Sequence, residues 1–260
     1  RDEAGQIIFG TLSEMEKANI RLHDLAVIRD PYVAIGIVVT VMFVVIALTR
    51  MPKTHGEQQN DNGVTRPIGI TLSNLWHNRL YRYGVISQVV YVAAQIMVWT
   101  FIIQYADNLG IDKATAQMYN ICAMSLSLCG RFAGTAIMKY VNSRNMLAIF
   151  GVCASILTLG TVVIQGMAGL YSLVMISLFM SIMFPTIYGI ALEKVDSQDT
   201  TFGAAFLVMA IVGGALMPPL QGLIIDQGTL FGMPAVNVSF CLPLICFVLI
   251  SCYGVWAIRR

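Results

Sequence analysis

The chain has 260 residues, of which 57% are hydrophobic and only 12% charged, and its formal net charge is +2. Soluble domains carry about 45–50% apolar and about 25% charged residues, so this composition excludes an ordinary soluble enzyme, a disordered chain and a coiled coil. The charges are also segregated: residues 145–192 contain no Lys, Arg, Asp or Glu, and residues 200–258 contain only Asp226. The sequence has no basic stripe of the kind that would indicate a nucleic-acid partner.

The hydrophobic runs predict an all-α fold, a polytopic transmembrane helix bundle. A helix needs about 20 mostly apolar residues to cross the bilayer core, and seven runs come near this length. They are residues 32–49, 82–106, 115–139, 145–165, 170–193, 200–225 and 236–258. The long uncharged stretch must turn between its two runs, and the glycines of segment 165–169 predict that turn.

The polar segments predict how the runs are organised. Residues 1–31 are expected to be an external segment and loop, and residues 50–80 a cytoplasmic linker before a six-helix bundle at 81–260. Lys and Arg gather near the helix ends that we assign to the cytoplasm, which predicts an external N-terminus and a cytoplasmic C-terminus. Because the chain begins with Arg1 and has an odd number of spans, we expect it to be a piece of a longer protein.

Two helices carry polar and aromatic side chains along one face. In each helix the four side chains follow one another at spacings of three and four, so they stay within about 80° of a common direction. The first stripe is Gln88, Tyr91, Gln95 and Trp99, and the second is Ser177, Ser181, Phe184 and Tyr188.

Such groups at bilayer depth must face a cavity or another helix. Hydrogen bonding between packed helices is one explanation, but two matching stripes favour a shared aqueous cavity. Amides, hydroxyls and flat aromatic rings suit a neutral polyol. The stripes contain no carboxylate or lysine, so we expect the ligand to be uncharged.

Helix-breaking and small residues predict bends in two spans. Pro185 interrupts the run 170–193, and the run 200–225 contains Gly213, Gly214, Pro218 and Pro219. Proline frees backbone carbonyls and kinks a membrane helix, and broken helices often act as hinges in transporters. A static kink filled by a neighbour is the alternative. The pair Gly130 and Gly134 predicts a close helix–helix approach.

Two charged residues near the cytoplasmic ends have predicted structural roles. Arg131 either snorkels toward the interface or donates hydrogen bonds to a neighbouring loop or helix end. Asp199 precedes a helix and is expected to cap its free N–H groups. The six cysteines and three histidines show no metal-binding spacing, and no catalytic motif is present. We therefore predict no metal, no cofactor and no enzymatic activity.

Three stretches resemble one family. The sequence Gly130-Arg131-Phe132-Ala133-Gly134-Thr135 after the first stripe is similar to the second half of a major facilitator transporter. The fucose permease branch, which contains L-fucose:proton symporters and hexose transporters, is the closest resemblance. It rests on residues 88–95 with Trp99 and Tyr105, on residues 179–187, and on residues 198–214.

The resemblance implies a fold and a mechanism. Helix 32–49 would be the sixth of twelve, and the missing N-terminal half of the same protein would supply the five helices before it. Two bundles would move by alternating access and carry a monosaccharide with a coupled proton across the lipid bilayer of a bacterial inner membrane. In this family the proton-titrating carboxylates belong to the N-terminal half.

The resemblance also implies site residues by position. They are Gln88, Tyr91, Gln95, Trp99 and Tyr119. Family members can carry Tyr where Phe184 stands, and the loss of that hydroxyl leaves open whether the sugar is L-fucose or a related hexose. A seven-helix receptor and a non-transporting subunit of a membrane complex are the two alternative functions.

Overall fold

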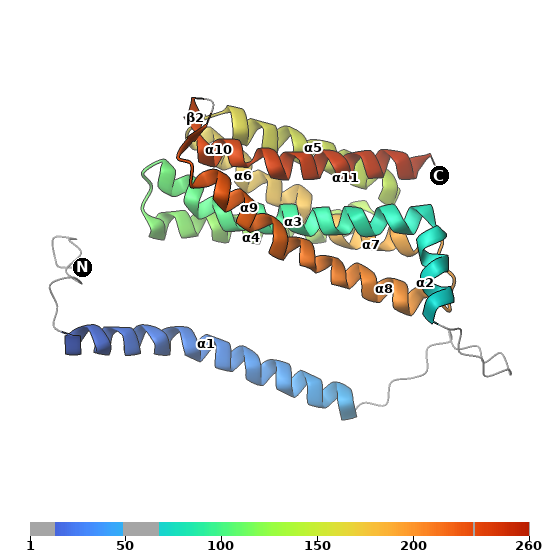
Figure 1. Ribbon diagram of the computed structural model, residues 1–260, viewed down its shortest axis with the longest axis horizontal. Helices are drawn as coiled ribbons and strands as arrows, with labels where there is room; N and C mark the ends of the chain where they lie inside the picture. The colour runs from blue at the N-terminus through green and yellow to red at the C-terminus, as the bar shows by residue number, and fades with distance from the viewer. Residues whose placement is uncertain (1–13, 49–67, 231, 260) are drawn as a thin grey trace. The chain divides into compact units, whose positions relative to one another are not determined.

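The computed structural model describes residues 14–48, 68–230 and 232–259. The chain divides into two compact units, residues 1–60 and 61–260, which are both drawn in Figure 1. Residues 1–13 of the predicted external segment and residues 50–67 of the predicted linker lie outside the described residues.

The first unit contains helix α1, Glu14–Leu48, with Pro31 inside it. The apolar run predicted a helix beginning at residue 32, so the start was wrong, and part of the predicted external segment is helical. The reason is that residues 14–30 contain no Gly or Pro and are rich in strong helix formers such as Glu, Ala, Leu and Arg. Hydrophobicity defines the apolar length of a span but not where its helix begins.

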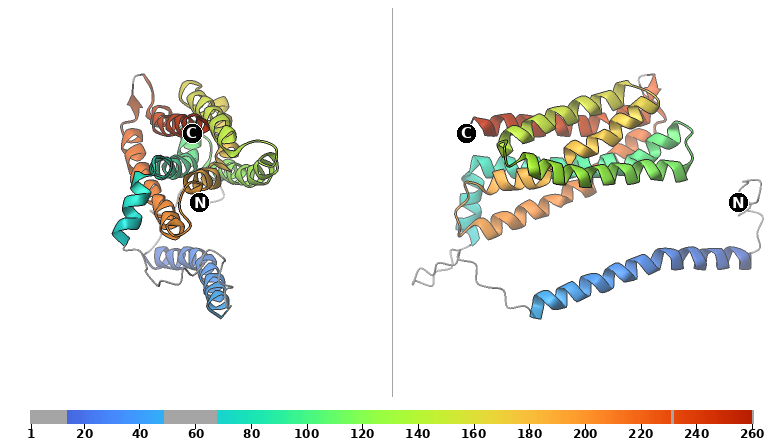
Figure 2. Two further views of the ribbon diagram at one scale, coloured as in Figure 1. Left: turned by 90° about the vertical axis from the view of Figure 1, so that its right-hand side faces the viewer. Right: turned by 180° about the vertical axis from the view of Figure 1, so that it is seen from behind.

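The second unit is a bundle of long helices that run alternately in opposite directions (Figures 1 and 2). A short helix, α2, Ile68–His77, crosses one end of the bundle inside the region predicted as linker. The other helices are α3 (Arg79–Asn108), α4 (Lys113–Ile137), α5 (Ser143–Val163), α6 (Met167–Met180), α7 (Met183–Leu192), α8 (Thr200–Met209), α9 (Gly213–Ile225), α10 (Ala235–Ser239) and α11 (Cys241–Ile258). A two-residue hairpin, β1 (Thr229–Leu230) with β2 (Met233–Pro234), joins α9 to α10.

Five helical segments among the described residues are long and apolar enough to cross a membrane. They are Arg79–Asn108, Ser143–Val163, Met167–Leu192, Thr200–Ile225 and Ala235–Ile258. Each matches a predicted run within three residues at either end. Helix α4, predicted as residues 115–139, has 25 residues but does not reach the same hydropathy. It nevertheless runs among the spans and packs against α3 and α6.

The span that contains Pro185 is broken one helical turn before this proline. The helix ends at Met180, turns at residues 181–182 and resumes as α7 at Met183. Proline has no N–H to donate and its ring clashes with the carbonyl four residues earlier, which here belongs to Ser181. The kink predicted from the sequence is therefore present, and its position follows from this spacing.

The span Thr200–Ile225 bends just before its glycine pair. A single 3₁₀ turn, η2, Ala210–Val212, separates α8 from α9, and such a turn inside a helix often marks a hinge. Gly213 follows at once, and a Cβ there would collide with the backbone carbonyl oxygen of Val89 on α3. Pro218 and Pro219 lie within α9 without ending it. The bend therefore falls at the close contact with α3 rather than at the prolines.

Small residues also allow close approaches elsewhere in the bundle. A Cβ at Gly130 would lie 2.5 Å from the Ser181 Oγ, and one at Gly134 would lie 2.7 Å from the Cδ1 of Ile182. This confirms the predicted close approach of α4, which here meets the break between α6 and α7. A Cβ at Gly254 of α11 would lie 2.9 Å from the amide nitrogen of Ala148 on α5.

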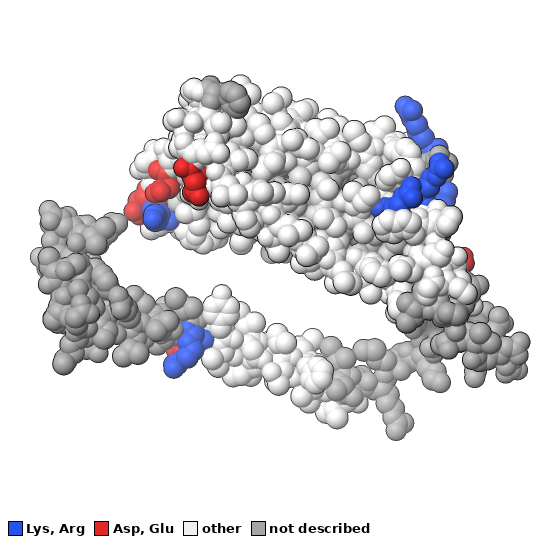
Figure 3. Space-filling model, in the orientation of Figure 1, with Lys and Arg blue, Asp and Glu red and all other residues white. Residues whose placement is uncertain are grey.

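Basic side chains collect at one end of the second unit (Figure 3). That end is formed by the beginnings of α3, α5 and α8 and by the ends of α4, α7 and α11. Its Lys and Arg residues are Arg79, Arg82, Lys139, Arg144, Lys194 and Arg259. The opposite end carries Asp107, Asp112, Lys113 and Asp226. The positive-inside rule predicts that this basic end is the cytoplasmic one.

The contact of Gly213 with α3 predicts a stability effect. We expect Gly213→Ala to lower the free energy of unfolding by about 1–3 kcal/mol, because the new methyl group must push two helices apart. The matched control is Gly222→Ala in the same helix, where the nearest atom, the Phe101 Cζ, is 4.0 Å from the new Cβ. Thermal unfolding of the full-length protein in detergent measures both variants, and equal behaviour would contradict the contact.

Candidate functional site

The polar stripe of α3 runs from a sealed region to an open one. Gln88 and Tyr91 are fully buried at 0% exposure, whereas Gln95 and Trp99 are half-buried. The four residues share one face of α3, as their spacing predicted. Within the described part of the chain, only Gln95 and Trp99 of these four residues are partly exposed.

Tyr91 connects α3 to the broken span. Its hydroxyl donates a hydrogen bond of 2.8 Å to the carbonyl oxygen of Met180, the last residue of α6. Its ring meets the ring of Phe184 edge to face, with 6.2 Å between centroids. A carbonyl at a helix end has no intrahelical donor, so Tyr91 supplies a donor at the break.

The two stripes meet at Trp99. The Trp99 Nε1 donates to the Oγ of Ser177 at 3.3 Å, which joins α3 to α6 at mid-span. Ser181, in contrast, is 1% exposed, and its hydroxyl donates to the carbonyl oxygen of Leu178 at 2.6 Å. Ser181 therefore occupies a helix–helix contact against Gly130 in this conformation, while Trp99 remains at the open face.

The side chains that remain half-buried come from three helices. They are Gln95 and Trp99 on α3, Tyr119 on α4, and Phe184 and Tyr188 on α7. Trp99, Tyr119 and Phe184 pack against the main hydrophobic core, and Tyr119 also meets Tyr171 edge to face at 6.2 Å. This set offers amide, hydroxyl and indole groups and aromatic faces without any ionised group.

A cavity of about 490 Å³ lies near the cytoplasmic end. It extends along α7 from Pro185 to Glu193 and reaches Arg144 at the start of α5. Pro185 is exposed and lines this cavity together with Arg144.

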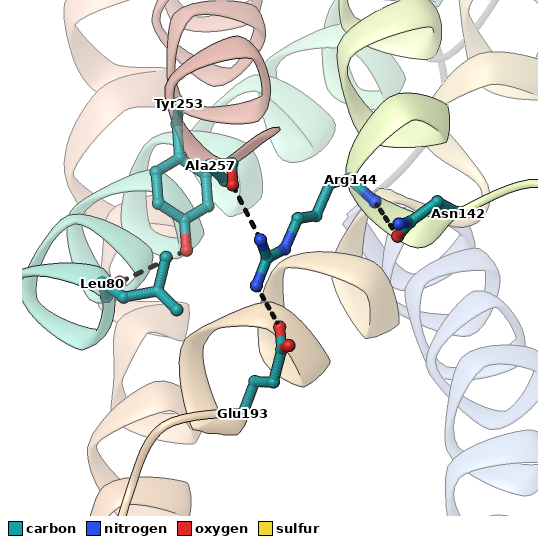
Figure 4. A network of polar contacts seen from close by, with 6 residues as sticks. All are labelled: Leu80, Asn142, Arg144, Glu193, Tyr253 and Ala257. Atoms are coloured by element: carbon teal, nitrogen blue, oxygen red, sulfur yellow. Dashed lines mark hydrogen bonds and ion pairs between the residues drawn. The ribbon is translucent and has the colours of Figure 1, made fainter. Parts of the chain in front are cut away.

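Arg144 organises the cytoplasmic end of the bundle (Figure 4). Its Nη1 donates to the carbonyl oxygen of Ala257 at 3.0 Å, and its Nη2 donates to the Oε2 of Glu193 at 2.7 Å. One guanidinium thus joins α5 to α11 and α7. Nearby, the hydroxyl of Tyr253 donates to the carbonyl oxygen of Leu80 on α3 at 3.3 Å. The sequence pattern did not predict this role, although Arg144 lies in the first turn of α5.

The predicted roles of Arg131 and Asp199 have different outcomes. Arg131 is exposed, and its two predicted roles, snorkelling toward the interface and donating hydrogen bonds to a loop or helix end, stay predictions. Asp199 is the N-cap of α8, but its side chain does not bond to the N–H groups of that helix. Its Oδ2 instead accepts from the Nδ2 of Asn74 on α2 at 3.4 Å. The prediction of a side-chain cap was wrong, because α2 brings a donor that the sequence pattern did not reveal.

A buried amide fixes the opposite end of the bundle. The Nδ2 of Asn237 on α10 donates to the hydroxyl of Tyr105 at 3.1 Å and to the carbonyl oxygen of Thr161 at 3.0 Å. The Tyr105 hydroxyl then donates to the carbonyl oxygen of Ile164 at 3.3 Å. These bonds join α3, α5 and α10, and they satisfy backbone groups where α5 ends before Gly166, which has a φ of 91°. Within the described residues no group of three or more His, Cys, Asp or Glu side chains is placed to hold a metal ion.

The chain is similar to known membrane transporters. The sequence pattern of the Major Facilitator Superfamily matches residues 22–218. An L-fucose-proton symporter of Haemophilus influenzae is 53% identical over 262 residues, which cover 100% of this chain and 60% of the relative. An L-fucose-proton symporter of Escherichia coli is 30% identical over 92% of this chain and 54% of its own length. A glucose/galactose transporter of Brucella abortus is 30% identical over 87% of this chain and 53% of its own length.

A solved structure is similar as well. The crystal structure of the transporter FucP in the outward conformation superposes with a TM-score of 0.80 at 27% identity, and the match covers 96% of this chain and 59% of that protein. The chain therefore spans somewhat more than half the length of these relatives.

The Arg144 contacts predict a stability effect. We expect Arg144→Met to lower the free energy of unfolding by about 1–3 kcal/mol, because it removes a charged donor from the carbonyl of Ala257 as well as the ion pair. Glu193→Gln is the matched control: Glu193 is 52% exposed, so we expect a loss below about 1 kcal/mol. Thermal unfolding of the full-length protein compares them, and losses of equal size would show that the bond to Ala257 contributes nothing.

Proposed function

The chain belongs to the Major Facilitator Superfamily, and we propose that it is the C-terminal part of a proton-coupled sugar symporter of a bacterial inner membrane. The proposed substrate is L-fucose or a related hexose. In this proposal residues 32–49 are the sixth of twelve spans, residues 50–80 are the cytoplasmic linker, and residues 81–260 are the C-terminal bundle.

One observation carries the proposal: Gln95 and Trp99 lie half-buried at mid-span on a face that is free of charge. An amide there can donate to one sugar hydroxyl and accept from another. The flat faces of Trp99 and Phe184 suit the C–H surface of a pyranose. The same face excludes a charged substrate, since a desolvated ion without a partner is costly at this depth.

The broken spans support alternating access. The break at residues 181–182 and the bend at Ala210–Val212 lie on either side of the α3 stripe, because α3 packs against α7 and α9. Broken helices close to the midplane are where many transporters hold their substrate. The receptor and subunit alternatives are less favoured, because the relatives compared above carry the names of symporters and transporters.

Two features bear on which sugar is carried. The Haemophilus relative, at 53% identity, is named for L-fucose, whereas the Brucella relative is named for glucose and galactose. Phe184 provides no hydroxyl at the edge of the site. We propose L-fucose as the first substrate to test and glucose and galactose as the competitors.

An uptake assay tests the proposal. The full-length protein, expressed in cells without their own fucose uptake, is given radiolabelled L-fucose with and without a protonophore. We expect uptake that depends on the proton gradient and that excess unlabelled substrate competes away. Uptake that survives the protonophore would contradict proton coupling, and the lack of uptake for all three sugars would contradict the proposed function.

The amide at the open face generates a mutational prediction. We expect Gln95→Met to reduce uptake at subsaturating sugar by about 10-fold or more, because a lost sugar hydrogen bond also leaves sugar hydroxyls unpaired. Gln104→Met is the matched control: Gln104 is exposed on the same helix, about 180° around its axis from Gln95. Surface expression is measured in parallel, and equal uptake by both variants would remove Gln95 from the site.

A further inference from the structure

Gln88 is a buried amide inside a span and has no hydrogen-bond partner among the described residues. Its side chain is 0% exposed, and neither its Nε2 nor its Oε1 forms a hydrogen bond to any described residue. In folded proteins most buried polar atoms form hydrogen bonds, so two buried polar atoms without a partner need an explanation. For the stability of this packed conformation alone, an aliphatic side chain would suit the position better than an amide.

The register of α3 against α7 shows what surrounds Gln88. A Cβ at Gly84 would lie 2.5 Å from the Cβ of Ala191, and Tyr91 meets Met180 and Phe184. The two helices run in opposite directions, so Gln88 lies opposite the middle of α7. That part of α7 is apolar and buried, with Met183 and Ile187 at 0% exposure and Ile190 at 3%.

The same register places Gln88 on the cytoplasmic side of the open face. It lies seven residues before Gln95, which is about 10 Å along a helix axis. Between Gln88 and the cytoplasm the bundle is closed by Leu80, Tyr81 and Gly84, which are all buried. Gln88 therefore lies in the layer that separates the proposed sugar site from the cytoplasmic end.

Helix α7 is a short element of this layer. It has only ten residues and is separated from α6 by the break at residues 181–182. Its link to α5, the ion pair of Glu193 with Arg144, is half exposed on the Glu193 side, and such pairs contribute little.

We propose that Gln88 is a gating residue, which destabilises the packed contact of α3 with α7 and gains water as hydrogen-bond partner when the two helices separate. The unpaired amide raises the free energy of the sealed state alone, because the separated state hydrates it. The population of the separated state is thereby increased. This role rests on the proposed transport function, and it makes Gln88 a positioning residue of the cytoplasmic gate rather than a contact for the sugar in the sealed state.

The test replaces the amide by an apolar group of similar length. In the full-length protein, Gln88→Met is expected to slow hydrogen exchange of the α7 amides by about 5- to 150-fold, the range that corresponds to the cost of one unpaired buried polar group. Turnover of L-fucose is expected to fall while the KM stays unchanged or decreases. Gln88→Asn keeps an amide and is expected to retain wild-type exchange and turnover.

Several outcomes would overturn the proposal. Unchanged exchange of α7 in Gln88→Met would show that the amide does not affect the sealed contact. An increased KM with unchanged exchange, the pattern expected of Gln95→Met, would make Gln88 a sugar contact instead. Exchange is measured without sugar, so it remains informative even if the full-length protein transports none of the sugars tested and the proposed function fails.

Discussion

The constraint on which this structure depends is that backbone polar groups at bilayer depth must find their partners inside the protein. Where the helices are interrupted, a side chain from another helix supplies the missing donor. Tyr91 donates to Met180 at the break between α6 and α7, and Asn237 donates to Thr161 near the end of α5. Arg144 does the same for Ala257 near the end of α11. The bundle can therefore bend without exposing backbone to lipid.

The sequence predicted the spans well because the length of an apolar run is set by the bilayer. It located the broken span as well, since proline acts on the residue four positions earlier, and Pro185 interrupts the helix beside Ser181. It did not predict the early start of α1 or the helix α2, because polar helices and polar loops have similar composition. It also missed Arg144 and Asn237, whose partners are 113 and 76 residues away in the chain.

For the candidate site, the sequence predicted which face of a helix the residues occupy, but not how deeply each residue is buried. Helical spacing correctly placed four side chains on one face of α3, but it has no information on depth between neighbouring helices. The structure separates Gln95 and Trp99, which are half-buried, from Gln88 and Tyr91, which are sealed. The same holds for Ser181. It is buried against Gly130 of α4, and residue spacing within one helix gives no information on contacts with another helix.

The bonds between helices also divide the second unit into firmly and weakly joined parts. The Asn237 network ties α3, α5 and α10 at one end, and Arg144 ties α5 to α11 at the other. In the span Thr200–Ile225 only 22% of the most apolar stretch is buried, against 44% in Ser143–Val163. The span Thr200–Ile225 also bends close to where Gly213 meets α3. Side-chain bonds from Tyr91, Trp99 and Arg144 hold the span Met167–Leu192, whereas the span Thr200–Ile225 meets α3 through close contacts at Gly213 and Gly214. Contacts of that kind can slide or separate at low cost, which is what a helix lining an alternating cavity requires.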